Sequence, residues 1–125
     1  MAKTVLIVDD SPTLRASVDF TLGEVGYRVL HAQNGKEALE LLAQFDGNGE
    51  EIGMIITDVN MPVMDGISFI KEVKRTPFKF VPILVMTTEA QETMKNEGRT
   101  VGASGWLVKP FKPEQLLNVV AKLAS

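Results

Sequence analysis

The chain contains 125 residues, 45% of them hydrophobic and 23% charged, with a net charge of −3 and no cysteine. These totals fit one soluble globular domain over residues 1–125 and exclude disulfide bonds and zinc sites built on sulfur. The net negative charge is not typical of a nucleic-acid-binding domain, which usually carries an excess of basic residues. No apolar run is long enough to span a membrane or to serve as a signal peptide, so we expect a cytoplasmic protein.

Patterns typical of strands and helices alternate five times along the chain. Short apolar runs predict strands over Val5–Val8, Tyr27–Ala32, Ile52–Asp58, Val81–Met86 and Gly105–Val108. Apolar residues at helical spacing predict helices from Ser11 and Pro12 to about Gly26, and over about Ala38–Phe45, Ile67–Arg75, Glu89–Val101 and Pro113–Leu123. The helix over Glu89–Val101 has few apolar residues, so we expect it to be loosely held. A polar, glycine-rich loop is predicted over Asp46–Glu51.

This alternation predicts an α/β fold, a five-stranded, doubly wound parallel sheet of (βα)5 type with helices on both faces. If the strand order is the flavodoxin-like 2-1-3-4-5, the second strand lies at one edge and the other four are contiguous. Polar residues follow those four strands but not the second. Because ligands bind at the carboxyl ends of parallel strands, where the strand order reverses, these polar ends should converge on a site.

Three carboxylates follow strands at this expected site, those of Asp9, Asp10 and Asp58. Like charges within a few ångströms repel and raise one another's pKa, and a divalent cation relieves that repulsion. Oxygen ligands suit Mg²⁺, which binds few carboxylates and keeps positions open for a phosphoryl oxygen. Lys109 would supply a positive charge and Thr87 a hydroxyl donor, so the set favours phosphoryl transfer to aspartate.

Each of these residues also has a purely structural alternative. The acidic pair after the first strand could be a solvated turn, Asp58 a turn initiator, and Thr87 a helix cap. Lys109 with Pro110 could simply mark the junction between a strand and a helix. The occurrence of all four features together, at the ends of the appropriate strands, favours the functional interpretation.

Over its whole length the sequence resembles response-regulator receiver domains, specifically the single-domain chemotaxis (CheY-like) type. The resemblance is carried by V-L-I-V-D-D, I-I-T-D-V-N-M-P-V-M-D-G, V-M-T-T-E-A and G-A-S-G-W-L-V-K-P-F. It implies that Asp58 is the phosphoacceptor, that Thr87 is the switch hydroxyl and that Lys109 pairs with the phosphoryl group. It also implies a cis peptide bond between Lys109 and Pro110.

The same resemblance implies Mg²⁺ as the cofactor. The expected ligands are the carboxylates of Asp10 and Asp58, Asp9 through a water molecule, and the backbone carbonyl of Asn60. The domain would catalyse only its own phosphorylation and dephosphorylation, and would not act as an enzyme on other substrates.

The resemblance further implies a sensor histidine kinase as phosphodonor, with small acyl phosphates as possible substitutes. Phosphorylation would alter the face formed by the fourth helix, fifth strand and fifth helix. With no effector domain expected after Ser125, the output would be contact with a downstream protein, either the flagellar motor switch or another phosphorelay protein. We expect a monomer, and it remains open whether the chain was cut from a larger protein.

Two residues depart from the family pattern. Trp106 stands where the family usually has tyrosine or phenylalanine on the fifth strand, and it is either a switch aromatic that reports activation or a core or rim aromatic. Thr88 stands where alanine or glycine is common, so its side chain is expected to crowd the phosphoryl entrance and slow small donors.

Three other functions compete with this interpretation. A phosphatase of the haloacid-dehalogenase class also forms an aspartyl phosphate, but it needs a second carboxylate two residues after the nucleophile, where this chain has Asn60. A flavodoxin-type flavin carrier would need a hydroxyl- and glycine-rich first loop for its phosphate, which Asp9 and Asp10 would repel. The third alternative is a receiver that only binds partners, and the complete set of site residues argues against it.

Overall fold

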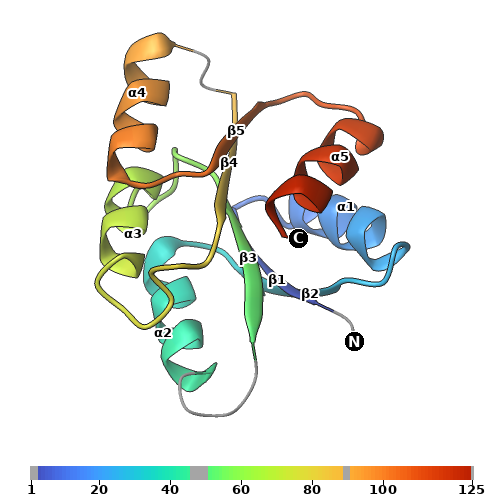
Figure 1. The fold of residues 1–125 in the computed structure, drawn as a ribbon, viewed down its shortest axis with the longest axis horizontal. Coiled ribbons are helices and arrows are strands. Elements are labelled where there is room, and N and C mark those ends of the chain that lie inside the picture. The colour runs from blue at the N-terminus through green and yellow to red at the C-terminus, as the bar shows by residue number, and fades with distance from the viewer. Residues whose placement is uncertain (1–2, 46–50, 89–90, 125) are drawn as a thin grey trace.

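The computed structural model describes residues 3–45, 51–88 and 91–124, in which five parallel strands form one sheet in the order β2-β1-β3-β4-β5 (Figure 1). The strands are β1 (Thr4–Val8), β2 (Arg28–Ala32), β3 (Ile52–Thr57), β4 (Ile83–Thr87) and β5 (Gly105–Val108). The helices are α1 (Pro12–Gly23), α2 (Gly35–Phe45), α3 (Gly66–Val73), α4 (Glu92–Val101) and α5 (Pro113–Leu123). This architecture confirms the predicted α/β fold and strand order.

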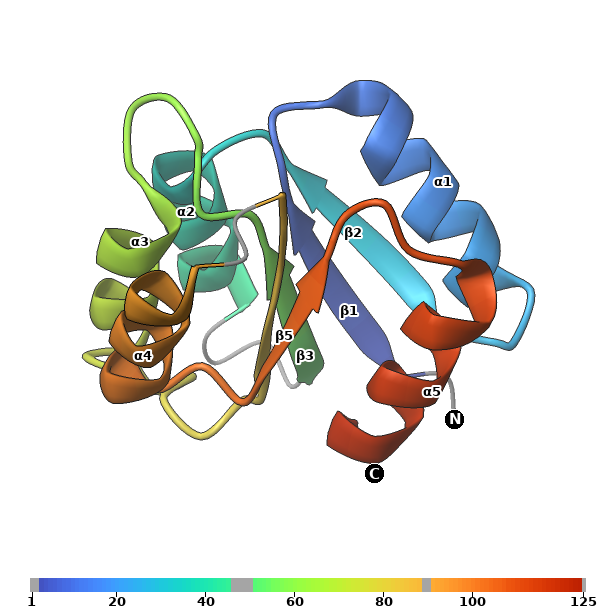
Figure 2. The same ribbon diagram turned by 90° about the horizontal axis from the view of Figure 1, so that it is seen from above.

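Two apolar layers hold helices against opposite faces of the sheet. Alternate residues of a strand point to opposite faces, so Leu6 and Val8 of β1 join the cluster beneath α2 and α3, while Val5 and Ile7 join the cluster beneath α1 and α5. Figure 2 shows α2, α3 and α4 on one side of the sheet and α1 and α5 on the other. The central strands are therefore buried on both faces, as expected for a parallel sheet.

Helices α1 and α3 each begin directly after a capping residue, in loops that follow the strands. The Ser11 hydroxyl accepts the Leu14 N–H at 3.2 Å, with Pro12 in the first turn, as the sequence predicted. Asp65 caps α3 by accepting both the N–H and the hydroxyl of Ser68, at 2.9 and 2.8 Å. Partial burial acts to raise the pKa of Asp65, but these hydrogen bonds outweigh it and lower the pKa below its usual 3.8.

Several boundaries differ from those predicted. Strand β3 ends at Thr57, so Asp58 follows the strand instead of forming its last residue. The Asp58 amide still donates to the Val8 carbonyl at 3.1 Å, and its carboxylate accepts the N–H of Val59 at 2.6 Å in the loop that follows the strand. Helix α1 ends at Gly23, and Gly26 closes the segment in a left-handed conformation with φ of 97°.

Some predictions fall outside the described residues. The polar loop expected over residues 46–51 is described only at Glu51, and the first part of the helix expected from Glu89 is likewise not described. Helix α4 begins at Glu92, and Gly98 is its only buried residue, which agrees with a loosely held helix. Among the described residues, no helix has the length and apolar character needed to cross a lipid bilayer.

The loop between β3 and α3 contains a strained residue. Val63 has φ of 72°, although its side chain is branched at Cβ, and the Met64 N–H donates to the Pro62 carbonyl at 2.7 Å. A hydrogen bond spanning three residues with positive φ at the middle one is the strained form of the γ-turn. A β-branched side chain is a clear outlier there, and Val63 is 75% exposed, so packing does not compensate.

We therefore expect Val63→Gly to raise the free energy of unfolding by roughly 1 kcal/mol, because relief of strain exceeds the added flexibility of the unfolded chain. The matched control is Val25→Gly, at another exposed valine without positive φ. That control should lower the free energy of unfolding. Equilibrium urea unfolding measures both, and a loss of stability in Val63→Gly equal to that of the control would contradict the strain.

Candidate functional site

The amine of Lys109 joins two carboxylates at the carboxyl edge of the sheet. Its Nζ donates to Asp9 Oδ2 at 2.9 Å and to Asp58 Oδ2 at 3.0 Å. Asp9 follows β1, Asp58 follows β3 and Lys109 follows β5, so residues separated by up to 100 positions meet at one point. The side chains of Asp9, Asp58 and Lys109 are 1%, 11% and 18% exposed, respectively. The sequence predicted this convergence, and the structure places these three residues together.

Burial and ion pairing act in opposite directions on Lys109. Burial alone would lower its pKa, but hydrogen bonds to Asp9 and Asp58, together with their negative charge, raise the pKa above the usual 10.5. Because the folded pKa exceeds the unfolded one, the stabilisation is complete below about pH 10.5 and is lost as pH rises through the raised pKa. Lys109 therefore stays charged throughout the physiological range.

Backbone N–H groups hold the remaining carboxylate oxygens. Asp9 Oδ1 accepts the Ser11 N–H at 2.9 Å. Asp58 Oδ1 accepts the N–H of Val59 at 2.6 Å and that of Asn60 at 3.3 Å. Each carboxylate is thus fixed between the lysine and its own following loop. Asn60, predicted to offer its backbone carbonyl to a metal, is exposed and lies in this loop beside Asp58.

Thr87 lies beside the site at the end of β4. Thr87 is fully buried, and its carbonyl accepts the Lys109 N–H at 2.8 Å, which places the threonine next to the lysine at the ends of neighbouring strands. Thr88 is exposed, so its expected effect on small donors stays a prediction. The Lys109–Pro110 peptide is cis, as the family resemblance implied.

The predicted cluster of three carboxylates is not formed. Asp10 is exposed, and the part of the chain that the structure describes contains no group of three Asp, Glu, His or Cys side chains placed to hold a metal ion. Lys109 neutralises only one of the two buried charges, so a third buried carboxylate would add uncompensated negative charge. Asp10 accordingly lies in solvent beside the pair formed by Asp9 and Asp58.

The oxygen donors nevertheless fit a hard divalent cation. Asp58 keeps part of its surface exposed, and Asp10 lies one residue beyond Asp9 at the same edge of the sheet. Carboxylate oxygens with adjoining backbone carbonyls are the ligands that Mg²⁺ prefers. Nitrogen and sulfur ligands do not enter this set.

Sequence reasoning missed Arg15, which reaches back from α1 to the site. Its guanidinium donates to the backbone carbonyl of Asp9, and its buried Nε has no hydrogen-bond partner among the described residues. The contact fixes the peptide that carries both acidic residues after β1. An arginine one turn into a helix gives no signal of this role, because the contact depends on how α1 packs beside β1.

Trp106 on β5 packs against a helix position without a side chain. A Cβ built on Gly98 of α4 would lie 2.7 Å from Trp106 Cζ3, closer than such atoms approach. Glycine in mid-helix costs about 1 kcal/mol relative to alanine, and here it makes room for the indole. The two residues are thus matched in size, and Trp106 is half-buried against the cluster beneath α2 and α3.

The close packing of Trp106 on Gly98 predicts that Gly98→Ala has opposite effects on the free energy of unfolding in two backgrounds. In the unmodified chain the new methyl group displaces the indole, which changes Trp106 fluorescence and lowers stability. In Trp106→Phe the clash is released, and the same substitution raises the free energy of unfolding by up to about 1 kcal/mol. Thr93→Ala, at an exposed position of α4, should act equally in both backgrounds. Equal effects of Gly98→Ala in both backgrounds would contradict the fit.

Comparisons with known proteins agree with this geometry. The model of the response regulator receiver domain family matches residues 5–121. Chemotaxis protein CheY1 of Helicobacter pylori is 40% identical over 114 residues, which cover 90% of this chain and 89% of that protein. A structure of chemotaxis protein CheY4 of Vibrio cholerae superposes with a TM-score of 0.89 and 45% identity, covering 98% of this chain and 99% of that one.

A third relative concerns the metal. The receiver domain of sensor histidine kinase PA1611 from Pseudomonas aeruginosa superposes with a TM-score of 0.81 and 25% identity, covering 99% of this chain and 98% of that one. That structure is described with a magnesium ion coordinated in its active site cleft. The family match across most of the chain, supported by relatives at this level of identity, shows that the chain belongs to the response regulator receiver domains of two-component signalling.

Proposed function

We propose that this receiver domain is a phosphorylation switch in which Asp58 accepts a phosphoryl group from a phosphohistidine of a sensor kinase. A carboxylate oxygen of Asp58 forms the new bond to phosphorus while the P–N bond of the donor breaks. The imidazole leaves with the electron pair and takes up a proton. The observation that carries the proposal is the half-buried amine of Lys109, 3.0 Å from the buried carboxylate of Asp58 and beside the buried Thr87.

The groups around Asp58 have two roles, orientation of the reacting carboxylate and neutralisation of charge. Asp9 and the backbone N–H groups of Val59 and Asn60 hold Lys109 and Asp58 in fixed positions before a donor arrives. Lys109 then neutralises part of the added charge, and the Thr87 hydroxyl donates to a phosphoryl oxygen. Positioning and charge neutralisation supply most of the catalysis in phosphoryl transfer.

Mg²⁺ would be held by Asp10 and Asp58, by Asp9 through water and by the backbone carbonyl of Asn60. When bound, it offsets the negative charge shared by the carboxylates and the incoming phosphoryl group. Support comes from the oxygen donors at this edge of the sheet and from the magnesium described in the receiver domain of PA1611. Lys109 alone balances only one of the two buried carboxylates, so a cation at this edge improves the charge balance.

Phosphorylation adds roughly one to two units of negative charge at Asp58. Thr87, at the end of β4, is positioned to respond because its backbone carbonyl is bonded to Lys109. Movement there would alter the face made by α4, β5 and α5, with Trp106 as its aromatic residue. A downstream protein binds that face. The match to chemotaxis proteins favours the flagellar motor switch as the partner, with another phosphorelay protein as the alternative.

Mass spectrometry after incubation with acetyl phosphate and Mg²⁺ tests the phosphoacceptor. The chain should gain the mass of one phosphoryl group, lost again on standing because an acyl phosphate hydrolyses. Asp58→Asn should abolish the gain. Asp65→Asn, in the same loop and able to keep its capping role, should retain it.

Each other outcome contradicts a part of this proposal. An unmodified mass would favour a receiver that only binds partners, and a gain retained in Asp58→Asn would place the phosphoryl group elsewhere. Trp106 fluorescence should change when Mg²⁺ and beryllofluoride are added together. An unchanged emission would exclude Trp106 as a residue that responds to activation.

A further inference from the structure

Arg15 of α1 is a half-buried cation that binds a neutral carbonyl group. Its Nη1 donates to the backbone carbonyl of Asp9, whereas its buried Nε has no hydrogen-bond partner among the described residues. No carboxylate in that part of the chain forms an ion pair with it. A buried donor without a partner destabilises a fold. Folding stability alone therefore does not explain why the guanidinium group lies at this peptide.

The contact completes the fixation of the backbone around Asp9. The Asp9 N–H donates to the Ala32 carbonyl of β2 at 3.1 Å, so the neighbouring strand holds the peptide that precedes Asp9. The peptide between Asp9 and Asp10 lies beyond the end of β1, and its carbonyl is held by Arg15. Both peptides that flank Asp9 are thus fixed, one by the sheet and the other by α1.

The orientation of Asp10 depends on the second of these peptides. Its side chain is exposed, and its carboxylate makes no hydrogen bond or ion pair within the described part of the chain. By contrast, Asp9 and Asp58 are each held by Lys109 and by backbone N–H groups. The peptide fixed by Arg15 is therefore the constraint that sets where the Asp10 carboxylate lies.

Two divalent ions differ in how much they need such a constraint. Mg²⁺ is small and requires near-ideal octahedral geometry, whereas Ca²⁺ accepts more oxygen ligands in flexible arrangements and at longer distances. A carboxylate on a loosened peptide therefore costs Mg²⁺ more binding free energy than it costs Ca²⁺. The charge of Arg15 opposes both ions to nearly the same degree, because each ion carries two positive charges. The ratio of the two affinities thus reports the positioning of Asp10 separately from charge.

We propose that Arg15 is a positioning residue that gives the carboxylate site its preference for Mg²⁺ over Ca²⁺, by fixing the peptide between Asp9 and Asp10. This inference rests on the proposed function, because it concerns the selectivity of the site in which Asp10 and Asp58 would hold the metal. Arg15 is not itself a ligand, since a guanidinium group has no acceptor to offer a cation. It acts through the backbone that carries Asp10.

Titration of the unmodified chain and of Arg15→Met with Mg²⁺ and with Ca²⁺, at constant ionic strength, tests the proposal. Backbone amide resonances around the site, followed by NMR, give both dissociation constants. Methionine keeps an unbranched side chain but lacks the charge and the donors. Arg15→Met should lower the ratio of Mg²⁺ affinity to Ca²⁺ affinity by about threefold or more. The ¹³C resonance of the Asp9 carbonyl should shift upfield in the same variant, because its hydrogen bond is lost.

The matched control is Lys36→Met, which removes an exposed cation at the start of α2, at the same edge of the sheet. It should leave the ratio unchanged, because charge acts on both ions alike. A ratio that is unchanged or raised in Arg15→Met, or lowered equally in both variants, would overturn the proposal. A lower free energy of unfolding in metal-free Arg15→Met, with an unchanged ratio, would assign Arg15 a structural role only and overturn it as well.

A second background tests whether Arg15 acts through Asp10. In Asp10→Asn the carboxylate to be positioned is absent, so Arg15→Met should no longer change the ratio. An equal change of the ratio in both backgrounds would contradict the proposed route.

Failure of this inference is distinguishable from failure of the proposed function. If the unmodified chain binds no Mg²⁺, the metal assignment and the inference are both wrong. If it binds Mg²⁺ and the ratio is unchanged in Arg15→Met, only the inference is wrong. Phosphorylation of Asp58 in the unmodified chain, measured by mass, tests the switch independently of the role of Arg15.

Discussion

The site depends on one half-buried ammonium group, that of Lys109, between two buried carboxylates. Removing Asp9 and Asp58 from water is costly, and Lys109 offsets that cost only because its amine reaches both oxygens at about 3 Å. The backbone N–H groups that bind the remaining oxygens fix the angle of each carboxylate. A charge arrangement of this kind is oriented before any donor approaches, as the proposed transfer to Asp58 requires.

The strand order explains why these three residues can meet. Strands β1 and β3 are neighbours, so the residues after them, Asp9 and Asp58, lie side by side at the carboxyl edge. β4 separates β3 from β5, and the long side chain of Lys109 spans that distance while its backbone N–H binds Thr87. A shorter side chain after β5 would not reach. The same order leaves β5 at an edge, where Trp106 remains accessible beside α4.

The sequence predicted the features that follow from periodicity and strand ends. Five alternations of strand and helix predicted the fold, and polar residues after four strands predicted the meeting of Asp9, Asp58 and Lys109. It did not predict that Asp10 stays in solvent, because that depends on how much buried negative charge one lysine can balance. It also placed Asp58 inside β3, since hydrophobic patterning does not show where a side chain begins to bind its own loop.

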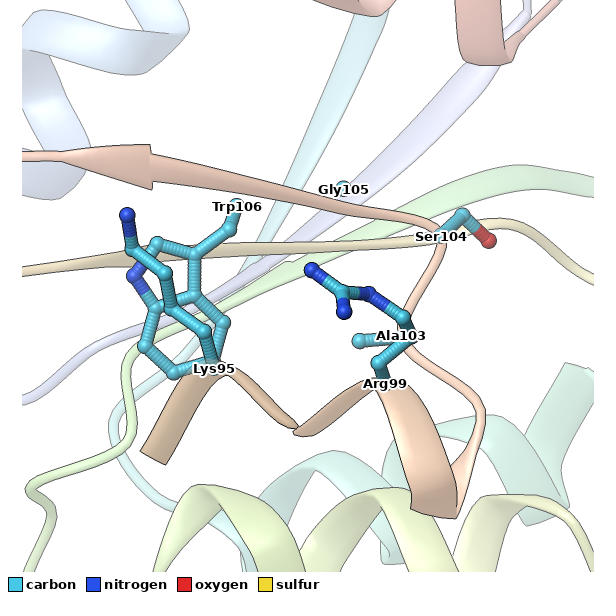
Figure 3. Close-up of a pocket in the computed structure, with 6 residues that line it drawn as sticks. All are labelled: Lys95, Arg99, Ala103, Ser104, Gly105 and Trp106. Carbon is cyan, nitrogen blue, oxygen red and sulfur yellow. The ribbon is translucent and has the colours of Figure 1, made fainter. Parts of the chain in front are cut away.

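Contacts between elements distant in sequence were the least predictable. The departure at Trp106 was visible in the sequence, but the compensating absence of a side chain at Gly98 appears only when α4 packs against β5. The contact of Arg15 with the Asp9 carbonyl likewise depends on the packing of α1. Lys95 and Arg99 likewise line one pocket together with Trp106 (Figure 3), a grouping that depends on the packing of α4 against β5.

A double-mutant cycle in the free energy of unfolding tests the central ion pair most directly. Asp58→Asn, Lys109→Met and the combined variant are compared with the unmodified chain by urea denaturation at neutral pH. We expect a coupling energy of about 1–3 kcal/mol, because loss of Lys109 leaves two buried carboxylates without a cation in one background and a single one in the other. A coupling energy indistinguishable from zero would contradict the buried contact between Lys109 and Asp58.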